Sequence, residues 1–168
     1  MHIRALEEND LIHIHELNNK LNVMAYWFEE PYESLSELKS LYQKHIYDET
    51  ERRFVIIKDG QFAGVIELVE IDYIHRNCEI QVIVKEEFQG EGLAQEAMAK
   101  GINYAFQILN LHKVFLYVDT ENEGAVHIYK KLGFKIEGTM IEQFYMRGDY
   151  KDCYFMGLFK RDWKHDYM

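Results

Sequence analysis

Residues 82–94 read VIVKEEFQGEGLA. A β-rich run over residues 80–84 ends at charged residues, a turn with Gly90 and Gly92 follows, and a helical pattern of apolar residues begins at Leu93. Glycine lets the backbone approach a ligand and adopt φ values that other residues avoid. The first amides of a helix have no partner inside it, and the helix dipole favours an anion there. The stretch therefore predicts a strand, an anion-binding turn and a helix, with a phosphate or pyrophosphate as the ligand.

The spacing of this turn differs from two common phosphate loops, because neither G-x-x-x-x-G-K-[ST] nor G-x-G-x-x-G is present. The pattern is Gln89-x-x-Gly92-x-Ala94. It resembles the [QR]-x-x-G-x-[GA] pyrophosphate loop of the GNAT superfamily of N-acetyltransferases. Taken alone, the hexapeptide also fits a glycine-containing helix start that binds nothing, so other blocks must decide between the two.

A second block, residues 122–134, reads NEGAVHIYKKLGF. It resembles the N-x-x-A-x-x-x-Y-x-x-x-G-F block of the same superfamily. The spacing also has a physical reading: Asn122 caps a helix, Ala125, Ile128 and Tyr129 share one face, and Gly133 ends it. Two blocks that agree favour the acetyltransferase interpretation.

Two further segments, YWFEEPY at 26–32 and IDYIHR at 71–76, narrow the resemblance to one branch. Together they are similar to the bacterial spermidine/spermine N-acetyltransferases. The similarity runs from about Arg4 to about Tyr154, which is nearly the whole chain.

Size and composition fit a globular protein of one domain over residues 1–168. The hydrophobic content is 48%, no apolar run approaches the length of ~20 residues that a membrane span needs, and no signal peptide is expected. Cys78 and Cys153 have neither metal nor redox spacing, which indicates free thiols in a reducing cytoplasm. The net charge of −10 disfavours a nucleic-acid partner and is compatible with a small cationic ligand.

The order of the predicted elements is β-α-α-β-β-β-α-β-α-β-β, an α/β fold with a mixed sheet flanked by helices, as in the GNAT fold. Helices are expected after a cap at Asn9 or Asp10, and from a Ser34/Glu37 capping box to about Asp48. Two more are expected within 89–109 and 122–132. The expected strands are 3–6, 54–57, 62–71, 78–84, 113–118, 134–146 and 150–159, with a hairpin turn at Asp59-Gly60.

The resemblance implies where acetyl-CoA binds. The edge of the strand ending at Val84 pairs with the pantetheine amides, and a splay between this strand and 113–118 admits the pantetheine arm. Glu91 adds a negative charge to the turn, which leaves the amides and the helix dipole to hold the pyrophosphate. The implied coenzyme residues are Val82, Ile83, Val84, Gln89, Gly90, Glu91, Gly92, Leu93, Ala94, Gln95, Asn122, Ala125, Ile128, Lys130 and Lys131.

Acetyl transfer needs a proton donor for the leaving thiolate and a route for the proton of the amine. Tyr129 is the candidate acid, and because a phenol titrates near ~10 and a thiol near ~8.5 it must act in a concerted, hydrogen-bonded step. A purely structural core aromatic is the alternative. Glu79 is the candidate relay through a water chain, and a solvated strand carboxylate is its alternative. No cysteine lies in a nucleophile context, which favours direct attack in a ternary complex.

Carboxylates and aromatic residues concentrate in residues 26–37, and these groups suit the ammonium and methylene groups of a polyamine. Glu33 and Glu37 are one helical turn apart and are expected to face the same way. In the resembling branch this segment forms a second polyamine site at a subunit interface, in dodecamers. The predicted polyamine residues are Asn18, Met24, Trp27, Glu29, Glu33, Glu37, His45, Asp48 and Glu51, with Glu79, Ile80 and Gln81 at the substrate.

Glu29 and Glu70 are predicted to share a divalent cation, which two carboxylates without His or Cys would restrict to a hard ion such as magnesium or calcium. The sequence thus predicts a cytoplasmic, homo-oligomeric, acetyl-CoA-dependent polyamine N-acetyltransferase. Two alternatives stay open: an acetyltransferase for another amine, such as a protein N-terminus or an aminoglycoside, and a non-catalytic polyamine sensor.

Overall fold

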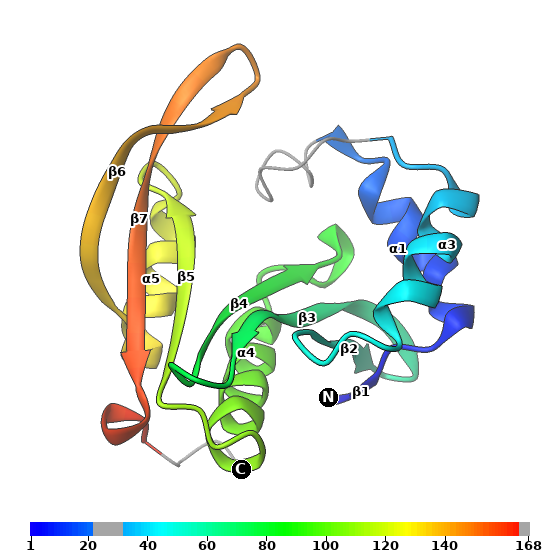
Figure 1. Cartoon of the computed structure of the whole chain (residues 1–168). Coiled ribbons are helices and arrows are strands. Elements are labelled where there is room, and N and C mark those ends of the chain that lie inside the picture. Colours follow the sequence, from blue (N-terminus) through cyan, green and yellow to red (C-terminus); the bar gives the residue numbers. More distant parts are fainter. Residues whose placement is uncertain (22–31, 165–168) are drawn as a thin grey trace.

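The computed structural model describes residues 1–21 and 32–164. In this part of the chain a seven-stranded sheet has the order β1-β2-β3-β4-β5-β7-β6 (Figure 1). Its strands are β1 (His2–Ala5), β2 (Arg52–Lys58), β3 (Gln61–Asp72), β4 (Asn77–Val84), β5 (Lys113–Asp119), β6 (Lys135–Met146) and β7 (Asp149–Phe159). The mixed sheet predicted from the element order is confirmed.

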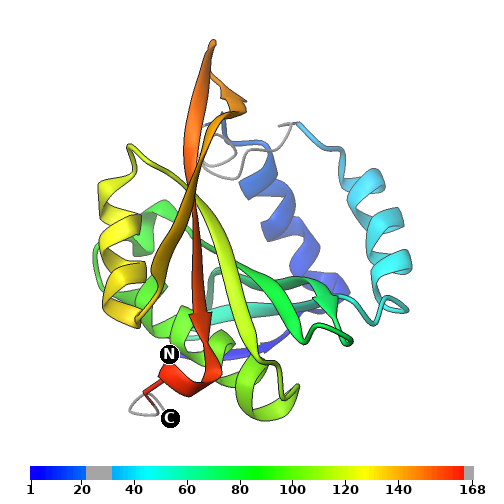
Figure 2. The same ribbon diagram turned by 60° about the vertical axis from the view of Figure 1, so that its left-hand side comes forward.

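Helices cover both faces of this sheet (Figure 2). The helices are α1 (Leu11–Asn18), α3 (Leu35–His45), α4 (Leu93–Asn103) and α5 (Glu123–Leu132). On one face, α4 and α5 bury a large apolar core against β2 to β5, which includes Ile66, Ile80 and Met98. On the opposite face, α1 packs Leu17 against Val55 and Val65 in a smaller core, and α3 lies against α1.

The two halves of the sheet separate between β4 and β5. This parallel pair joins residues 77–79 only with 113–115, and the last partners are Glu79 and Phe115. Beyond them β4 continues to Val84 and β5 to Asp119, but the two strands no longer pair with each other and diverge (Figure 1). The predicted splay is therefore confirmed, and it leaves the end of β4 with a strand edge that β5 does not cover.

Several element boundaries differ from the prediction. The first strand is His2–Ala5 rather than 3–6, and α3 ends at His45 rather than near Asp48. The helix that begins at Leu93 continues after Asn103 as a π-helical turn, Tyr104–Ile108. The Ser34/Glu37 capping box is present, with Ser34 Oγ accepting from the Glu37 amide.

Asp10 occupies the N-cap position of α1, as predicted, but its side chain makes no cap hydrogen bond to this helix. Its carboxylate instead accepts from both Nη atoms of Arg4, at 2.7 and 2.8 Å, and from the Glu7 amide at 2.8 Å. A bidentate ion pair with an arginine stabilises a carboxylate more than one hydrogen bond from a backbone amide does. None of the described helices is long and apolar enough to span a membrane.

Candidate functional site

The turn after β4 presents free backbone amides. Gly90 and Gly92 have φ values of 84° and 75°, in the left-handed region that favours glycine. In α4 the first intrahelical bond runs from the Glu96 amide to the Gly92 carbonyl, so the amides of residues 93–95 have no partner inside the helix. The Gln89 side chain donates to the Val84 carbonyl at 3.1 Å and thereby braces the turn. This geometry fits the predicted anion-binding turn.

A cavity of about 810 Å³ lies where β4 and β5 diverge, above this turn. Its walls come from the end of β4, the turn and start of α4, the end of β5 and the start of α5. The lining residues are Val82, Ile83, Val84, Glu86, Phe88, Gln89, Gly90, Gly92, Leu93, Ala94, Gln95, Tyr117, Val118, Asp119, Asn122, Ala125, Ile128, Tyr129 and Arg147. A cavity of this size suits a cofactor-sized ligand.

Most of the predicted coenzyme residues thus come together on one cavity. Glu91, Lys130 and Lys131 do not line it. Sequence reasoning missed Tyr117 and Arg147, among other lining residues. Arg147 is in the turn between β6 and β7, far from the motifs in sequence, so only the strand order β5-β7-β6 brings it here.

Asn122, which precedes α5, and Tyr129, within α5, both line this cavity. Asn122 caps the helix, since its Oδ1 accepts from the Ala125 amide at 3.3 Å. The Tyr129 ring packs edge-on against Phe134, with centroids 6.0 Å apart, and burial raises the pKa of its hydroxyl to about 12. No described residue forms a hydrogen bond with this hydroxyl. Tyr129 therefore stays protonated at physiological pH and can donate a hydrogen bond into the cavity.

Glu79 lies at the point where β4 and β5 separate. Its Oε1 accepts from Gln81 Nε2 at 2.8 Å. Burial, with a smaller effect from the negative charges of Glu70 and Glu67, raises the pKa of the Glu79 carboxyl above its ordinary value. A carboxyl with a raised pKa exchanges protons closer to neutral pH, as a proton relay requires.

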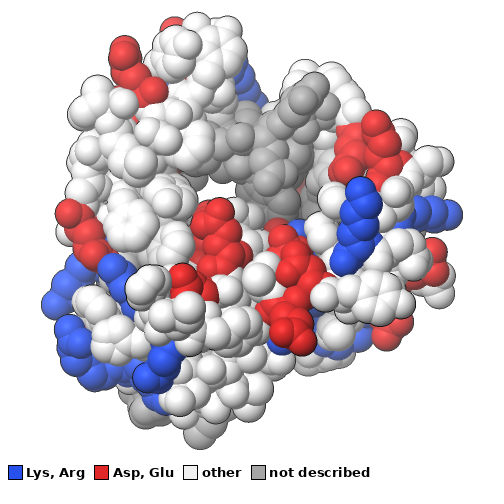
Figure 3. Space-filling view, in the orientation of Figure 1, with Lys and Arg blue, Asp and Glu red and all other residues white. Residues whose placement is uncertain are grey.

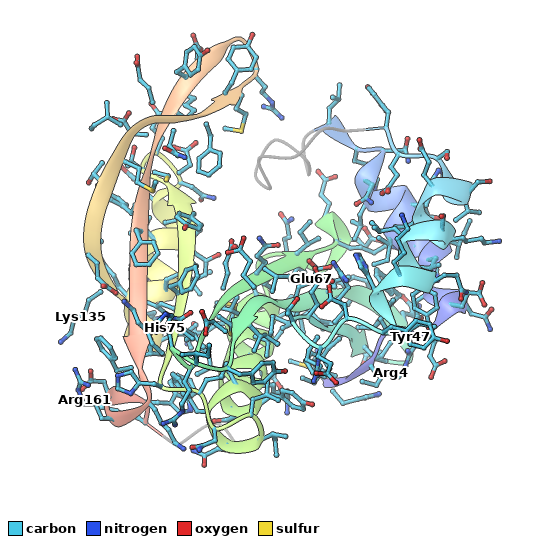
Figure 4. The ribbon with its side chains drawn as sticks, viewed as in Figure 1. Arg4, Tyr47, Glu67, His75, Lys135 and Arg161 are labelled. Carbon is cyan, nitrogen blue, oxygen red and sulfur yellow. The ribbon has the colours of Figure 1, made fainter. Side chains whose placement is uncertain are left out.

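A row of charged and polar groups extends from Glu79 across one face of the sheet. Gln81 pairs with Glu67 on β3, and Glu67 pairs with Arg53 on β2, so these side chains share the face. Figure 4 shows Glu67 on β3 beside α3. In Figure 3 acidic side chains gather in the middle of this face, over β3 and β4. The arrangement would concentrate cations near the point where β4 and β5 separate. Ile80 points the other way and is buried in the large core, so its side chain cannot meet a ligand on this face.

A second cavity, of about 700 Å³, lies between α1, α3 and the start of β2. Asn18, Glu33, His45, Asp48 and Glu51 line it, as the polyamine prediction requires. Its polar centre is Arg53, whose guanidinium contacts three groups: Glu51 Oε2 at 2.6 Å, Glu67 Oε1 at 2.9 Å and His45 Nδ1 at 2.5 Å. Burial, followed by the Arg53 charge, lowers the pKa of His45, which favours the neutral imidazole.

The expectation that Glu33 and Glu37 face the same way is wrong. Helix α3 begins at Leu35, so Glu33 precedes it, lines the second cavity and accepts from Asn18 Nδ2 at 2.9 Å. Glu37 is exposed, and its carboxylate accepts from the Ser34 amide at 2.8 Å. The capping box therefore directs Glu37 away from the cavity.

Met24, Trp27 and Glu29 lie outside the described residues. Glu70 is exposed, with a positive φ of 52° at an irregularity of β3. Within 1–21 and 32–164 no group of three or more His, Cys, Asp or Glu residues could hold a metal ion. The cation site of Glu29 and Glu70 stays a prediction.

If Glu79 relays the proton of the amine through water, Glu79→Gln should lower kcat/KM by about 10²-fold, at the low end for a general base. In the unchanged protein, kcat/KM should fall as the pH drops through the raised pKa of Glu79, and the variant should lack this acid limb. The folded state favours the protonated carboxyl of Glu79. The free energy of unfolding should therefore decline as the pH rises through the raised pKa, and Glu79→Gln should not show this decline. Steady-state rates and urea unfolding across pH test both. A variant that keeps the acid limb would contradict the assignment, and Glu8→Gln, an exposed carboxylate, is the control.

A mixed sheet that opens over an amide-lined turn, with Tyr129 of α5 in the same cavity, is the arrangement expected of a coenzyme-dependent N-acetyltransferase. The chain belongs to the family described as the acetyltransferase (GNAT) domain, whose pattern matches residues 1–135. It is 49% identical over 161 residues to the spermidine N(1)-acetyltransferase of Escherichia coli K12, covering 96% of this chain and 87% of that protein. It is 52% identical over 152 residues to the Vibrio cholerae enzyme of the same name, covering 89% and 87%. The crystal structure of Vibrio cholerae spermidine N-acetyltransferase in complex with CoA and spermine superposes with a TM-score of 0.93, at 48% identity and 96% coverage of each chain.

Proposed function

We propose that this protein transfers the acetyl group of acetyl-CoA to a nitrogen of a polyamine, spermidine or spermine. The observation that carries the proposal is the identity of about half of all residues, along nearly the whole chain, with two spermidine N(1)-acetyltransferases. The described sheet face supports it, because its carboxylates lie beside the coenzyme cavity and suit a polycation.

The chemistry assigned to each residue follows from its surroundings. The free amides of residues 93–95 and the helix dipole would hold the pyrophosphate, and the uncovered edge of β4 would pair with pantetheine amides. A polyamine nitrogen with a pKa near ~10 arrives as ammonium and must lose a proton before it attacks, and Glu79 is assigned as the relay. Tyr129 is assigned as the donor to the leaving thiolate. The amine attacks the thioester directly, since Cys78 and Cys153 are both buried and burial raises the pKa of each thiol, that of Cys78 to about 12.

A thiol-release assay with acetyl-CoA tests the proposal. Spermidine and spermine should release CoA with saturation, whereas an aminoglycoside and a peptide with a free N-terminus should react far more slowly. Mass spectrometry should find one acetyl group on the polyamine. Faster turnover of the aminoglycoside or the peptide would favour another amine acetyltransferase, and coenzyme binding without turnover of any amine would favour a sensor.

We further propose that the second cavity is an allosteric polyamine site at a subunit interface of a cytoplasmic homo-oligomer, a dodecamer, and that Glu29 and Glu70 share a divalent cation. The cavity supports the site, because Glu33, Asp48 and Glu51 supply carboxylates around a volume of about 700 Å³. Arg53 already neutralises Glu51 and Glu67, so a polyamine that enters must share or displace this internal cation.

The double change Glu33→Gln with Glu37→Gln should lower the apparent affinity or the cooperativity for spermine several-fold, as the loss of charge partners implies. The single variants then separate the contributions. Most of the loss should follow Glu33→Gln, since Glu33 lines the cavity, whereas glutamine at position 37 can still serve the capping box. Initial rates against spermine concentration measure the effect. If the double variant keeps the wild-type apparent affinity and cooperativity for spermine, this segment is only a solvated helix.

A further inference from the structure

The turn between β6 and β7 places an arginine at the coenzyme cavity. Met146 and Asp149 are partners in the β6–β7 pair, so Arg147 and Gly148 form the two-residue turn of this hairpin. Arg147 lines the coenzyme cavity, whose walls also include the start of α4 and Asn122. It lines a smaller cavity as well, of about 390 Å³, between the hairpin and the β5–α5 loop. The arginine therefore borders the space in which CoA binds.

Two contacts hold the hairpin against the β5–α5 loop. β5 ends at Asp119, and the β6–β7 hairpin projects beyond this point (Figure 1). There the Thr120 amide donates to the Asp152 carbonyl at 3.2 Å. Lys151 Nζ forms an ion pair with Glu121 Oε2 in the same loop. The position of the turn relative to the cavity is thus fixed by hydrogen bonds on both sides of the loop.

The charge of Arg147 differs from that of the other charged residues around the cavity. It is the one basic residue among the described residues that line the cavity, whereas Glu86 and Asp119 in the same lining are acidic. Glu91 adds a further negative charge to the turn before α4. CoA carries a pyrophosphate and a separate 3′-phosphate, so these carboxylates oppose its binding. The amides of residues 93–95 offer only partial charges, and Arg147 is placed to supply a full positive charge.

The guanidinium of Arg147 has no partner within the part of the chain that the structure describes. It is exposed, and it makes no hydrogen bond or ion pair with residues 1–21 or 32–164. Its φ is 51°, and Gly148 beside it has a φ of 89°. Hairpin turns with two positive φ values favour Asn, Asp or Gly at the first of these positions, so an arginine there costs backbone strain. Strain of this kind persists at ligand sites, where the side chain serves binding.

Arg147 belongs to the end of the cavity that is remote from the acetyl group. Its hairpin contacts the loop that leads into Asn122, and Tyr129 lies about two helical turns further along α5, on the order of 10 Å away. Tyr129 is assigned to the leaving thiolate, so the Asn122 end is the one available for phosphate groups. The planar guanidinium fork suits this chemistry, because it can form two parallel hydrogen bonds to phosphate oxygens.

We propose that Arg147 is a coenzyme-binding residue that pairs with a phosphate group of CoA from the hairpin side of the cavity. The inference concerns the coenzyme alone and goes beyond the proposed transfer to a polyamine. The amides of residues 93–95 hold one phosphate group and the guanidinium neutralises another or shares the same one. The 3′-phosphate and the pyrophosphate are the two candidate groups, and dephospho-CoA, which lacks the 3′-phosphate, distinguishes them.

The test is calorimetric titration of Arg147→Asn with CoA in the absence of any amine. Asparagine suits the positive φ of this turn, so the variant should be at least as stable as the wild type in urea unfolding. The Kd of CoA should rise by about 5- to 30-fold, as the loss of a charge-assisted pair implies. A rise for CoA but not for dephospho-CoA would identify the 3′-phosphate as the bound group, and an equal rise for both would identify the pyrophosphate.

Arg76→Asn is the matched control. Arg76 is also an exposed arginine with a positive φ, 56°, but it lies in the β3–β4 turn outside the coenzyme cavity, where its guanidinium donates to the Asn110 carbonyl. Removing this charge should change the Kd of CoA by less than about twofold, because a distant exposed charge is screened. An unchanged Kd in folded Arg147→Asn, or an equal rise in Arg76→Asn, would overturn the inference. Absence of polyamine turnover by the wild type would overturn the proposed function alone, since the titration contains no amine.

Discussion

Gly92→Val should weaken binding of CoA by about 10²- to 10⁴-fold, which corresponds to the loss of two hydrogen bonds to a charged group at ~1.5–3 kcal/mol each. Gly92 has a φ of 75°, and a Cβ built on it meets no atom within 4 Å. The added side chain therefore has room, but the space that it enters lies beside the free amides of residues 93–95. A β-branched residue also strains this backbone and would turn the amides away from their present direction.

Backbone strain alone must be separated from loss of the anion site. Gly60 is a matched position, since its φ is 78°, its Cβ would also meet nothing within 4 Å, and it lies in the β2–β3 turn outside the coenzyme cavity. Both variants should lose about 1–2 kcal/mol of stability in urea unfolding. Only Gly92→Val should lose affinity in calorimetric titration with CoA. Equal affinity in the folded Gly92→Val and Gly60→Val proteins would remove the turn as the pyrophosphate site.

Local signals made much of the fold and the turn predictable. The strand over 77–84, the glycines at 90 and 92 and the helix from Leu93 all depend on residues adjacent in sequence. The Asn122 cap and the end of α5 at Gly133, where φ is 105°, are equally local. The β4–β5 splay came from family resemblance, because no residue pattern states how far two strands pair.

The two errors arise from short-range hydrogen bonds that compete for a side chain, and the omissions arise from contacts between distant residues. Asp10 has the residue type and position of a helix cap, but Arg4 on the preceding strand competes successfully for its carboxylate. Glu37 has the spacing to share a face with Glu33, but the capping box uses its carboxylate before any ligand can. For both carboxylates, the direction of the side chain is set by a hydrogen bond that the helical spacing of residues does not predict.

A cluster of aromatic side chains beside Glu79 shows the same limit for the site. Phe115, Tyr117, Phe144 and Phe155 lie on three strands, and β6 becomes a neighbour of β5 only through β7. From sequence each residue is an ordinary alternating strand aromatic. Their union with Glu79 depends on the parallel β4–β5 register, which pairs Glu79 with Phe115.

Tyr129→Phe should lower kcat by about 10²- to 10⁴-fold, as general acids typically contribute. The leaving thiolate has a conjugate acid with a pKa near ~8.5, whereas burial raises the pKa of Tyr129 to about 12. Proton transfer to a free thiolate would be uphill, so the hydroxyl gives its proton only in concert with cleavage of the C–S bond, through a hydrogen bond that strengthens as that bond breaks. Because the interaction develops in the transition state, the Kd of CoA should stay nearly unchanged.

A structural role for Tyr129 makes the opposite prediction. Its ring packs on Phe134 and would do so equally as phenylalanine, so a core aromatic would tolerate this change and lose stability only on truncation to alanine. Tyr104→Phe is the control, since Tyr104 is also half-buried and packs on Phe54 at 4.8 Å, away from the coenzyme cavity. Because a phenol with a pKa of about 12 stays protonated, kcat should show no basic limb from Tyr129 below about pH 11. If Tyr129→Phe turns over at the rate of Tyr104→Phe, the thiolate takes its proton from bulk water.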